Sequence, residues 1–309
     1  MILCITPNPA VDRTARVSRV VIGEILRPLE VLALAGGKGL NVARAARTLG
    51  ARVRTTGVAG GHAGRWIVEQ AAGEGLNPRF VEGAHESRTT YVVTGDHGRS
   101  VMVYEKGLDQ PDSCFDELIS LLRTELLPGC SYAVIAGGLP TGVDPKYLGR
   151  LVAACNEAGV RCVVDSHGPA VLAALAERPF ILKATQEEMA ESGFLSRNGD
   201  PLAMARAAVK QGAEACVVTI GARGAVACYG ADCWRVTVPR QNAINAVGAG
   251  DAFTAGLVVA LSESLGFEAA LVQAGAAGAA SVLQLGAGHL DPAKVRELAP
   301  LVHVRRQAA

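Results

Sequence analysis

The sequence predicts an α/β fold in which a mostly parallel β-sheet is covered by helices on both faces. Short apolar runs alternate with amphipathic helical stretches along most of the 309 residues, as in chains built from strand–helix units. Half of the chain is apolar but only 4% is aromatic, so small and branched aliphatic side chains must fill the core. Crossovers between parallel strands are expected to be right-handed.

The main sheet is expected from six apolar runs, each long enough for one buried strand. They are Ile2–Ile5, Val53–Val58, Tyr132–Ala136, Cys162–Asp165, Phe180–Leu182 and Cys216–Ile220. Helical periodicity occupies most of the sequence between them. The expected helices are Leu40–Leu49, Trp66–Gly73, Phe115–Leu126, Pro145–Ala158 and Leu202–Gln211, followed from about Asp251 by an almost entirely helical stretch through Leu257–Leu265, Ala269–Leu283 and Pro292–Leu298.

Two regions break this alternation and predict a second, smaller sheet. Thr14–Val21 and Leu29–Leu34 have strand character without a helix between them, and Arg88–Thr94 and Ser100–Tyr104 flank the turn sequence Gly95-Asp-His-Gly98. These strands either form a lid beside the main sheet or extend its edge. We expect a lid, built from about residues 12–35 and 86–106, within a single domain that spans residues 1–309.

Composition excludes several classes of protein. A net charge of +1 gives no electrostatic reason to expect nucleic acid or an anionic membrane as a partner. No stretch reaches about 18 uninterrupted apolar residues, and the N-terminus lacks the basic segment of a signal peptide, so a cytoplasmic protein is expected. The eight cysteines contain no C-x-x-C pair, which favours buried free thiols over a zinc site.

The strongest candidate for chemistry is Val247-Gly-Ala-Gly-Asp251, which stands directly before an apolar helical run. Its glycines permit backbone angles closed to other residues, so peptide N–H groups at the helix start can converge on an anion. Asp251 could then accept the proton of an attacking hydroxyl during phosphoryl transfer. An ordinary Gly-rich loop with Asp251 as helix N-cap fits the same residues, and the spacing is not that of a Walker A loop.

A second Gly-rich turn enters a helix at Gly36-Gly-Lys-Gly-Leu-Asn41. Its first two glycines allow close approach to a polyhydroxylated ligand, Lys38 could meet a ligand phosphate, and Asn41 can both donate to and accept from hydroxyls. Asn8-Pro-Ala-Val-Asp12, directly after the first strand, adds a carboxylate that can hold two neighbouring hydroxyls. A turn with a solvated lysine and a surface aspartate explains these residues equally well.

Six motifs in this order resemble the PfkB branch of the ribokinase-like carbohydrate kinases. They are Asn8-Pro-Ala-Val-Asp12, Gly36-Gly-Lys-Gly-Leu-Asn41, Ala136-Gly-Gly-Leu-Pro-Thr-Gly142, Val164-Asp-Ser166, Thr219-Ile-Gly-Ala-Arg-Gly224 and Val247-Gly-Ala-Gly-Asp251-Ala-Phe. The first two are similar to the subgroup that acts on ketohexose phosphates, of the phosphofructokinase and tagatose-6-phosphate kinase type. The resemblance implies a ribokinase-like three-layer αβα sandwich with a β-sheet lid that covers the sugar and, in many members, forms a homodimer contact.

The resemblance also implies roles for single residues. Asp251 matches the general base, and Gly248, Ala249 and Gly250 match an anion hole. Residues that match the sugar and its phosphate are Asp12, Gly37, Lys38, Asn41, Arg88 and Arg27. Residues that match the nucleotide region are Lys183, Glu188, Thr219, Gly221, Gly224, Gly275 and Ala279. The implied cofactors are ATP and Mg²⁺, and the metal is expected to keep its waters and to have few direct protein ligands.

Three residues depart from the family pattern. Thr185 stands where the family usually carries an asparagine, and its hydroxyl cannot offer an amide's donor and acceptor together. Gly138 replaces a serine that is frequent in the subgroup, and His167 is unusual after Asp165-Ser166. These departures affect nucleotide handling and the choice among fructose 6-phosphate, fructose 1-phosphate and tagatose 6-phosphate, each acting through a primary hydroxyl.

Three other functions remain alternatives. The same fold could phosphorylate an unphosphorylated sugar or a nucleoside, although Lys38 and Arg88 would then have no anion to bind. A catalytically weak sugar-phosphate sensor is the second alternative, and the residue that favours it is Thr185, which stands in place of the family's asparagine. A dinucleotide-dependent dehydrogenase is disfavoured, because the first strand is not followed by G-x-G-x-x-G.

Overall fold

The computed structural model describes residues 1–95, 100–196 and 198–307. Its main sheet has the strand order β14-β13-β12-β11-β10-β9-β8-β1-β4-β5. The bounds are β1 Ile2–Thr6, β4 Val53–Gly60, β5 Val81–Gly83, β8 Tyr132–Ala136, β9 Arg161–Asp165, β10 Ile181–Thr185, β11 Ala215–Thr219, β12 Ala225–Tyr229, β13 Asp232–Thr237 and β14 His303–Gln307. Pairing is parallel from β5 to β11 and antiparallel from β11 to β14, which confirms the mostly parallel sheet.

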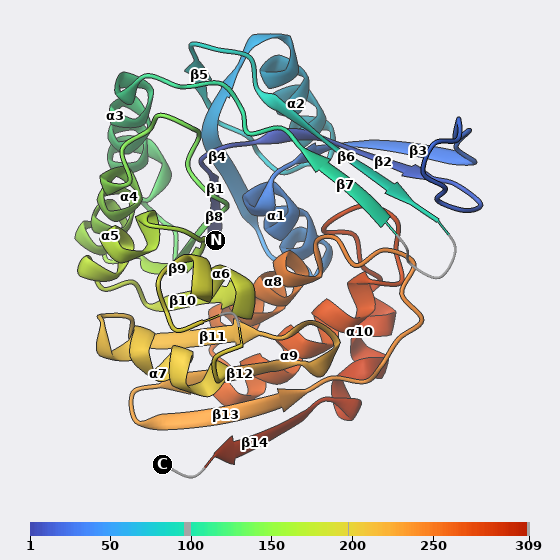
Figure 1. Cartoon of the computed structure of the whole chain (residues 1–309). Helices are drawn as coiled ribbons and strands as arrows, with labels where there is room; N and C mark the ends of the chain where they lie inside the picture. The colour runs from blue at the N-terminus through green and yellow to red at the C-terminus, as the bar shows by residue number, and fades with distance from the viewer. Residues whose placement is uncertain (96–99, 197, 308–309) are drawn as a thin grey trace.

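Helices cover both faces of this sheet (Figure 1). One face carries α1 Lys38–Thr48, α2 Gly61–Gly73, α8 Ala249–Ser262, α9 Phe267–Ser281 and α10 Pro292–Leu298. The other carries α3 Asp112–Leu121 with the π-helical turn Leu122–Leu126, α4 Lys146–Glu157, α5 Ala170–Ala176, α6 Gln186–Glu191 and α7 Pro201–Lys210. Along β1, Ile2 and Cys4 pack into the first core while Leu3 and Ile5 pack into the second. The predicted three-layer αβα sandwich is therefore confirmed.

The irregular regions form a separate small sheet of order β3-β2-β6-β7, which settles the choice between a lid and an extended edge. Its strands are β2 Ala10–Arg16, β3 Glu30–Gly36, β6 Arg88–Thr94 and β7 Ser100–Tyr104. The prediction of a strand at Thr14–Val21 was wrong in its bounds, because β2 begins at Ala10 and pairs with both β3 and β6 only as far as Arg16. Most of the predicted turn Gly95-Asp-His-Gly98 lies outside the described residues.

The sequence interpretation missed the antiparallel edge formed by β12, β13 and β14. The expectation of an almost entirely helical end was wrong at His303–Gln307, a polar strand that pairs with β13. This strand lies at the edge of the sheet and alternates weakly between exposed and half-buried residues, so it has no apolar pattern to detect. The helices α5 and α6, of seven and six residues, were also missed.

The expectation that all eight cysteines are free thiols was wrong for one pair. Cys228 and Cys233 form a disulfide across the β12–β13 hairpin. Antiparallel register places the two residues directly opposite each other, with Cα atoms 4.1 Å apart. The other six cysteines are free. Among the described residues, no helix has the length and apolarity to cross a membrane.

Candidate active site

The candidate active site lies at the carboxyl ends of the parallel strands, where ligands of open α/β sheets usually bind. A charged cavity of about 220 Å³ is enclosed by β10, the first turns of α1 and α8, and the small sheet. An apolar cavity of about 340 Å³ adjoins it, between the β11–β12 turn, α8 and α9. Thr185 and Gly250 line both cavities, so ligands in the two spaces would meet above Gly250.

Asp251 lies in the first turn of α8 with its side chain in the charged cavity. The helix begins at Gly248, whose φ of 84° is left-handed, and a Cβ there would lie 2.7 Å from that of Ala287. Asn41 Nδ2 donates to Asp251 Oδ2 at 2.9 Å. Burial, and next the negative charge of Asp165, raise the pKa of Asp251 to about 7. A carboxylate with this pKa can accept a proton near neutral pH.

The residues at the start of α8 line different cavities. Ala249 N–H donates to Ala246 O at 3.3 Å, and Ala249 lines the apolar cavity. Gly248 and Gly250 line the charged cavity. The N–H groups of Gly250 and Asp251 belong to the first helical turn and have no acceptor within their own helix, so they can serve a ligand anion.

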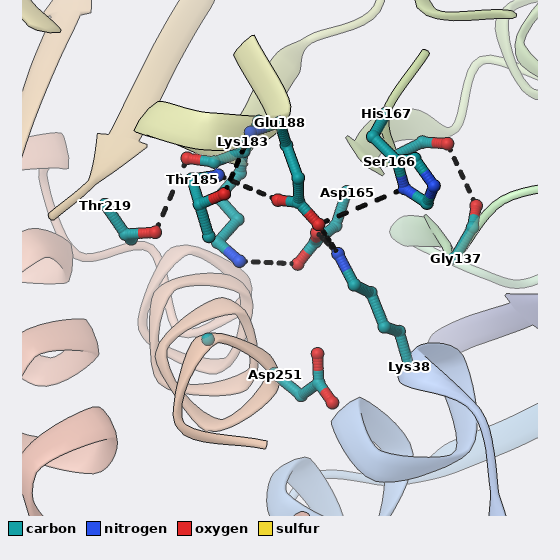
Figure 2. Close-up of polar contacts among 12 residues, drawn as sticks. Lys38, Gly137, Asp165, Ser166, His167, Lys183, Thr185, Glu188, Thr219 and Asp251 are labelled. Carbon is teal, nitrogen blue, oxygen red and sulfur yellow. Dashed lines mark hydrogen bonds and ion pairs between the residues drawn. The ribbon is translucent and has the colours of Figure 1, made fainter. Parts of the chain in front are cut away.

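Asp165, at the end of β9, joins both lysines of the site (Figure 2). It accepts hydrogen bonds from Lys38 Nζ at 3.0 Å, Lys183 Nζ at 2.8 Å and Thr254 Oγ1 at 3.0 Å. Burial opposes ionisation of Asp165, but the ammonium groups of Lys183 and Lys38 outweigh it and hold its pKa well below the usual range. The carboxylate is therefore ionised at every physiological pH and fixes the position of both cations.

Lys38 extends from the first turn of α1 and also pairs with Glu188 Oε1 at 2.5 Å. Burial favours its neutral form, but Asp165 and Glu188 outweigh burial and raise the pKa of Lys38 above its usual value. Glu188 is held in turn by a capping box on α6, in which Thr185 Oγ1 accepts from Glu188 N–H and Thr185 N–H donates to Glu188 Oε2. The positive charge of Lys38 is thus already balanced by two carboxylates.

Asp12 on β2 faces the charged cavity and is oriented by two donors. Thr90 Oγ1 donates to Asp12 Oδ1 at 2.6 Å, and Gly37 N–H donates to Oδ2 at 3.4 Å. Its side chain lies against Gly36, where a Cβ would overlap the carboxylate, so the glycine makes room for it. Burial is the main reason that the pKa of Asp12 is raised.

Arg88, the first residue of β6, lines the charged cavity opposite α8. Its guanidinium donates to the main-chain oxygens of Asn8 and Glu105 at 3.2 to 3.4 Å. Within the described residues it forms no ion pair with a carboxylate. Arg88 therefore brings to the cavity a guanidinium that no carboxylate of the described residues pairs with directly, although the charges of Asp12 and Glu105 act on it from a distance.

The apolar cavity has an interior of hydrophobic side chains and a polar opening. Its interior is formed by Val238, Phe253, Ala279 and Val282, and α9 leaves room for it by carrying small residues at Gly275, Gly278 and Ala279. A Cβ on Gly275 would lie 3.0 Å from Val302 and 3.1 Å from Val238. Thr219, Gly221 and Gly224 form its polar side at the end of β11. A flat aromatic ring with a polar chain directed at Gly250 matches this shape.

A model of the pfkB family carbohydrate kinases matches residues 6–294. The chain belongs to the pfkB family of carbohydrate kinases. Among solved structures, Escherichia coli phosphofructokinase-2 in complex with potassium is similar, with a TM-score of 0.86 and 27% identity over 97% of this chain and 98% of that one. The same enzyme in complex with fructose-6-phosphate gives 0.83 and 26% over the same shares. A Thermotoga maritima protein described as a possible 1-phosphofructokinase gives 0.87 and 21% over 100% of both chains, which bears on the fold alone.

In this pfkB kinase, nearly all the residues that the sequence motifs predicted for the site line one of the two cavities. Those that line the charged cavity are Asp12, Gly37, Lys38, Asn41, Arg88, Lys183, Glu188, Gly248, Gly250 and Asp251. Those that line the apolar cavity are Thr219, Gly221, Gly224, Ala249, Gly275 and Ala279, together with Gly250. Arg27 is the exception, since it is exposed in the segment between β2 and β3, at the end of the small sheet far from Asp12. Its assignment to the sugar phosphate stays a prediction.

Two departures from the pfkB pattern prove to be neighbours. A Cβ on Gly138 would lie 3.3 Å from Cε1 of His167, so the imidazole occupies the space beside the glycine. His167 Nδ1 lies 4.0 Å from Glu188 Oε1, as Figure 2 shows. The loss of a side chain at residue 138 is therefore matched by the presence of a ring at residue 167.

Sequence reasoning gave no role to several polar residues in or beside the pfkB site, among them Arg44, Thr90, Asp165 and Thr254. Asp165 offered a signal, because it ends a buried strand at the same sheet edge as the other motifs. Thr90 lies on β6 in register with Asp12, but this pairing is visible only once the small sheet is known. Arg44 and Thr254 lie within helical patterns that predict ordinary packing.

Proposed function

We propose that the protein transfers the γ-phosphoryl group of ATP to a primary hydroxyl of a ketohexose phosphate, and that residues 1–309 act as one kinase domain. The observation that carries the proposal is the position of Arg88, a guanidinium that has no direct ion pair among the described residues and shares the charged cavity with Asp251 and Asp12. A guanidinium suits phosphate oxygens because its planar donors bind two at once. Lys38 does not carry the same weight, since Asp165 and Glu188 already balance its charge.

In this mechanism Asp12 orients the sugar and Asp251 accepts the proton of the attacking hydroxyl. The carboxylate of Asp12 can accept from two adjacent sugar hydroxyls, while Thr90 and Gly37 hold it in place. Negative charge on the transferred group would face the N–H groups at Gly250 and Asp251 and the ammonium of Lys183. The small sheet would lie over the sugar and exclude water that could otherwise hydrolyse ATP.

ATP would bind with its adenine in the apolar cavity and its triphosphate along the turn at Thr219–Gly224. Because Thr185 and Gly250 line both cavities, the terminal phosphate would reach the acceptor there. No group of three or more His, Cys, Asp or Glu residues within the described ranges is arranged to hold a metal ion. Mg²⁺ fits this site as a phosphate-bound ion that keeps its waters, with Glu188 and Thr185 as oxygen partners; it would supply charge neutralisation.

Two alternatives predict different substrates. A kinase of free sugars or nucleosides would leave Arg88 without an anion, which is why we favour an acceptor that is already phosphorylated. A sugar-phosphate sensor would bind ligand without turnover, but the raised pKa of Asp251 is a feature of a working base. The similarity to an enzyme solved with fructose-6-phosphate adds support for a ketohexose phosphate.

ADP formation tests the proposal. Purified protein is incubated with ATP, Mg²⁺ and, in turn, fructose 6-phosphate, fructose 1-phosphate, tagatose 6-phosphate, free fructose and adenosine. We expect ADP release that depends on one or more of the three sugar phosphates. Faster turnover of fructose or adenosine would favour the neutral-substrate kinase, whereas tight sugar-phosphate binding without ADP would favour the sensor.

We further propose a homodimer through the outer face of the small sheet. Along β6, Thr90 and Val92 face the charged cavity, so Tyr91 must point outwards. Tyr91 and its cross-strand partner Val103 are 44% and 57% exposed, an apolar pair that a second copy of the chain could cover. Sedimentation equilibrium should give a dimer for the wild type and a monomer for Val103→Glu. A monomeric wild type would contradict this arrangement.

A further inference from the structure

Arg44 is the most extensively bonded buried cation of the described chain that the proposed chemistry does not use. It lies in the second turn of α1 and is only 5% exposed. Its five N–H groups all have acceptors: Nε and Nη2 bind the two carboxylate oxygens of Glu74, Nη2 also binds Ala35 O, and Nη1 binds both Ala287 O and Asn41 Oδ1. A buried arginine with every donor satisfied is rigidly held.

The bond from Arg44 to Asn41 determines how the amide of Asn41 is turned. An asparagine can present either its oxygen or its NH₂ group to a neighbour, and the two orientations fill the same space. Arginine has donors only and stays charged at all accessible pH values, so the amide oxygen of Asn41 must be the atom that faces Arg44. The NH₂ group of Asn41 must then face Asp251, where Nδ2 donates to Oδ2 at 2.9 Å.

The opposite orientation would place the amide oxygen of Asn41 against the carboxylate of Asp251. Two acceptors would then face each other, which favours the protonated form of the base and raises its pKa. Burial has already raised the pKa of Asp251 to about 7, so a further rise would leave less of the ionised base at neutral pH. The direction of one amide therefore affects how much active base is present.

Arg44 also holds the loop against which α8 begins. It binds Ala287 O at 2.9 Å, and a Cβ on Gly248 would lie 2.7 Å from that of Ala287. On the other side of that loop, a Cβ on Gly288 would lie 2.4 Å from Asn41 O. One guanidinium thus supports both the amide beside the base and the loop beneath the helix start.

We propose that Arg44 is a positioning residue for the reaction, fixing the amide of Asn41 so that it donates to Asp251 and keeps this carboxylate ionised. The proposal rests on the proposed function, in which Asp251 is the base. Glu74 balances the charge of Arg44 through two hydrogen bonds, so the buried cation is stable where it lies. The chain of contacts runs Glu74–Arg44–Asn41–Asp251 and links α2, α1 and α8.

The test compares Arg44→Lys with Asn41→Asp. Lysine keeps the positive charge but has a single nitrogen, which cannot reach the Asn41 oxygen together with the other acceptors. Asn41→Asp keeps an oxygen for Arg44 but has no N–H for Asp251, and it adds a negative charge beside that carboxylate. In Arg44→Lys we expect the acid limb of the kcat/KM profile to move up by roughly one pH unit, and in Asn41→Asp we expect a larger shift because of the added charge. We also expect kcat at pH 7 to fall about 10- to 100-fold, with the KM for ATP nearly unchanged.

Ile67→Val is the control for a merely structural effect. Ile67 is a fully buried residue of α2 in the same core, and its shortening loosens packing without touching any donor of Arg44. This variant should unfold at a lower temperature with an unshifted pH profile. If Ile67→Val shifts the acid limb as Arg44→Lys does, or if Asn41→Asp keeps the wild-type limb, the positioning role is wrong.

A titration without turnover separates this inference from the proposed function. The carboxyl carbon of Asp251 is followed by ¹³C NMR against pH in the wild type, Arg44→Lys and Asn41→Asp. A higher pKa in the variants supports the orientation of Asn41 even if no sugar phosphate is turned over, in which case only the proposed function fails. Equal pKa values in all three proteins would overturn the inference, whatever the activity.

Discussion

The ammonium group of Lys183 lies over the Cα atom of Gly250, so that a Cβ there would be 2.8 Å from Nζ. Lys183 is only 1% exposed and its Nζ is bound by Asp165 at 2.8 Å, which prevents the side chain from moving aside. The glycine of the phosphate-facing turn is therefore required by a neighbouring cation as well as by its own backbone. This contact brings a positive charge to the point where the two cavities meet.

Gly250→Ala should impair activity because the new methyl group displaces Lys183 from Asp165. We expect kcat to fall about 100-fold, as for a misplaced electrostatic group. Overpacking should also cost about 1–3 kcal/mol in the free energy of unfolding. Gly73→Ala, which adds the same methyl group at an exposed position of α2 with no atom within 4 Å, is the kinetic control. Wild-type turnover in Gly250→Ala would show that this contact has no role.

Asp251→Asn should reduce kcat by about 10²- to 10⁴-fold, since it removes the proposed general base but preserves its size. In the wild type, kcat/KM should rise with pH through about 7, because the pKa of Asp251 is raised to about 7. A pH-independent profile with full turnover in Asp251→Asn would remove this residue from the mechanism.

The same variant should be more stable than the wild type at neutral and alkaline pH. The folded state raises the pKa of Asp251 above its ordinary value of 3.8, so the folded protein binds more protons than the unfolded chain and loses stability as pH rises. The loss accumulates between about pH 4 and pH 7 and is constant above. Asp251→Asn should therefore gain about 1–4 kcal/mol in the free energy of unfolding at pH 8, and little at pH 4. Denaturant unfolding at both pH values checks the sign.

Arg88→Gln should raise the KM for the sugar phosphate about 10- to 100-fold, because charged hydrogen bonds to the phosphate are lost. The KM for ATP should change by less than about twofold, since ATP would occupy the other cavity. Arg13→Gln is a matched control: Arg13 is exposed and stands in register with the outward-facing Tyr91, on the opposite face of the small sheet. Equal changes in both KM values would contradict the clamp role of Arg88.

The role of Thr185 can be tested through its position as the N-cap of α6. Asparagine is at least as good an N-cap as threonine, so Thr185→Asn should keep the free energy of unfolding within about 0.5 kcal/mol, whereas Thr185→Ala should lose about 1 kcal/mol. Without the side-chain cap the first turn of α6, which carries Glu188, is held less firmly, and the KM for ATP should rise in Thr185→Ala. If the alanine variant matched the wild type in both measurements, the capping box would have no part in nucleotide binding.

Local motifs were sufficient to predict most of the site. Asp251, Gly248 and Gly250 belong to one short segment with glycines at a helix start, and such segments have a recognisable chemistry. The parallel strands were equally readable, because strands buried on both faces are continuously apolar. The αβα layers followed from the strand pattern, whereas Lys183, Glu188, Thr219 and the other residues of the nucleotide region were named only through the resemblance to the pfkB family.

The remaining features depend on contacts between distant residues. Asp165 meets Lys38 across 127 residues of sequence, and no spacing rule indicates that its role is to hold two lysines. Cys228 and Cys233 become partners only through the register of an antiparallel hairpin. Arg44 resembles any charged residue on an amphipathic helix until the position of Ala287 is known. Such relationships are properties of the tertiary fold.

The most direct test of the account is ³¹P NMR of a reaction that contains the protein, ATP, Mg²⁺ and each ketohexose phosphate in turn. We predict a new phosphomonoester signal on at least one sugar, in stoichiometric amount with ADP, and its absence when Asp251→Asn replaces the wild type. ADP accompanied only by inorganic phosphate, or no ADP with any of the three sugar phosphates, would contradict the assignment of this site to a ketohexose-phosphate kinase.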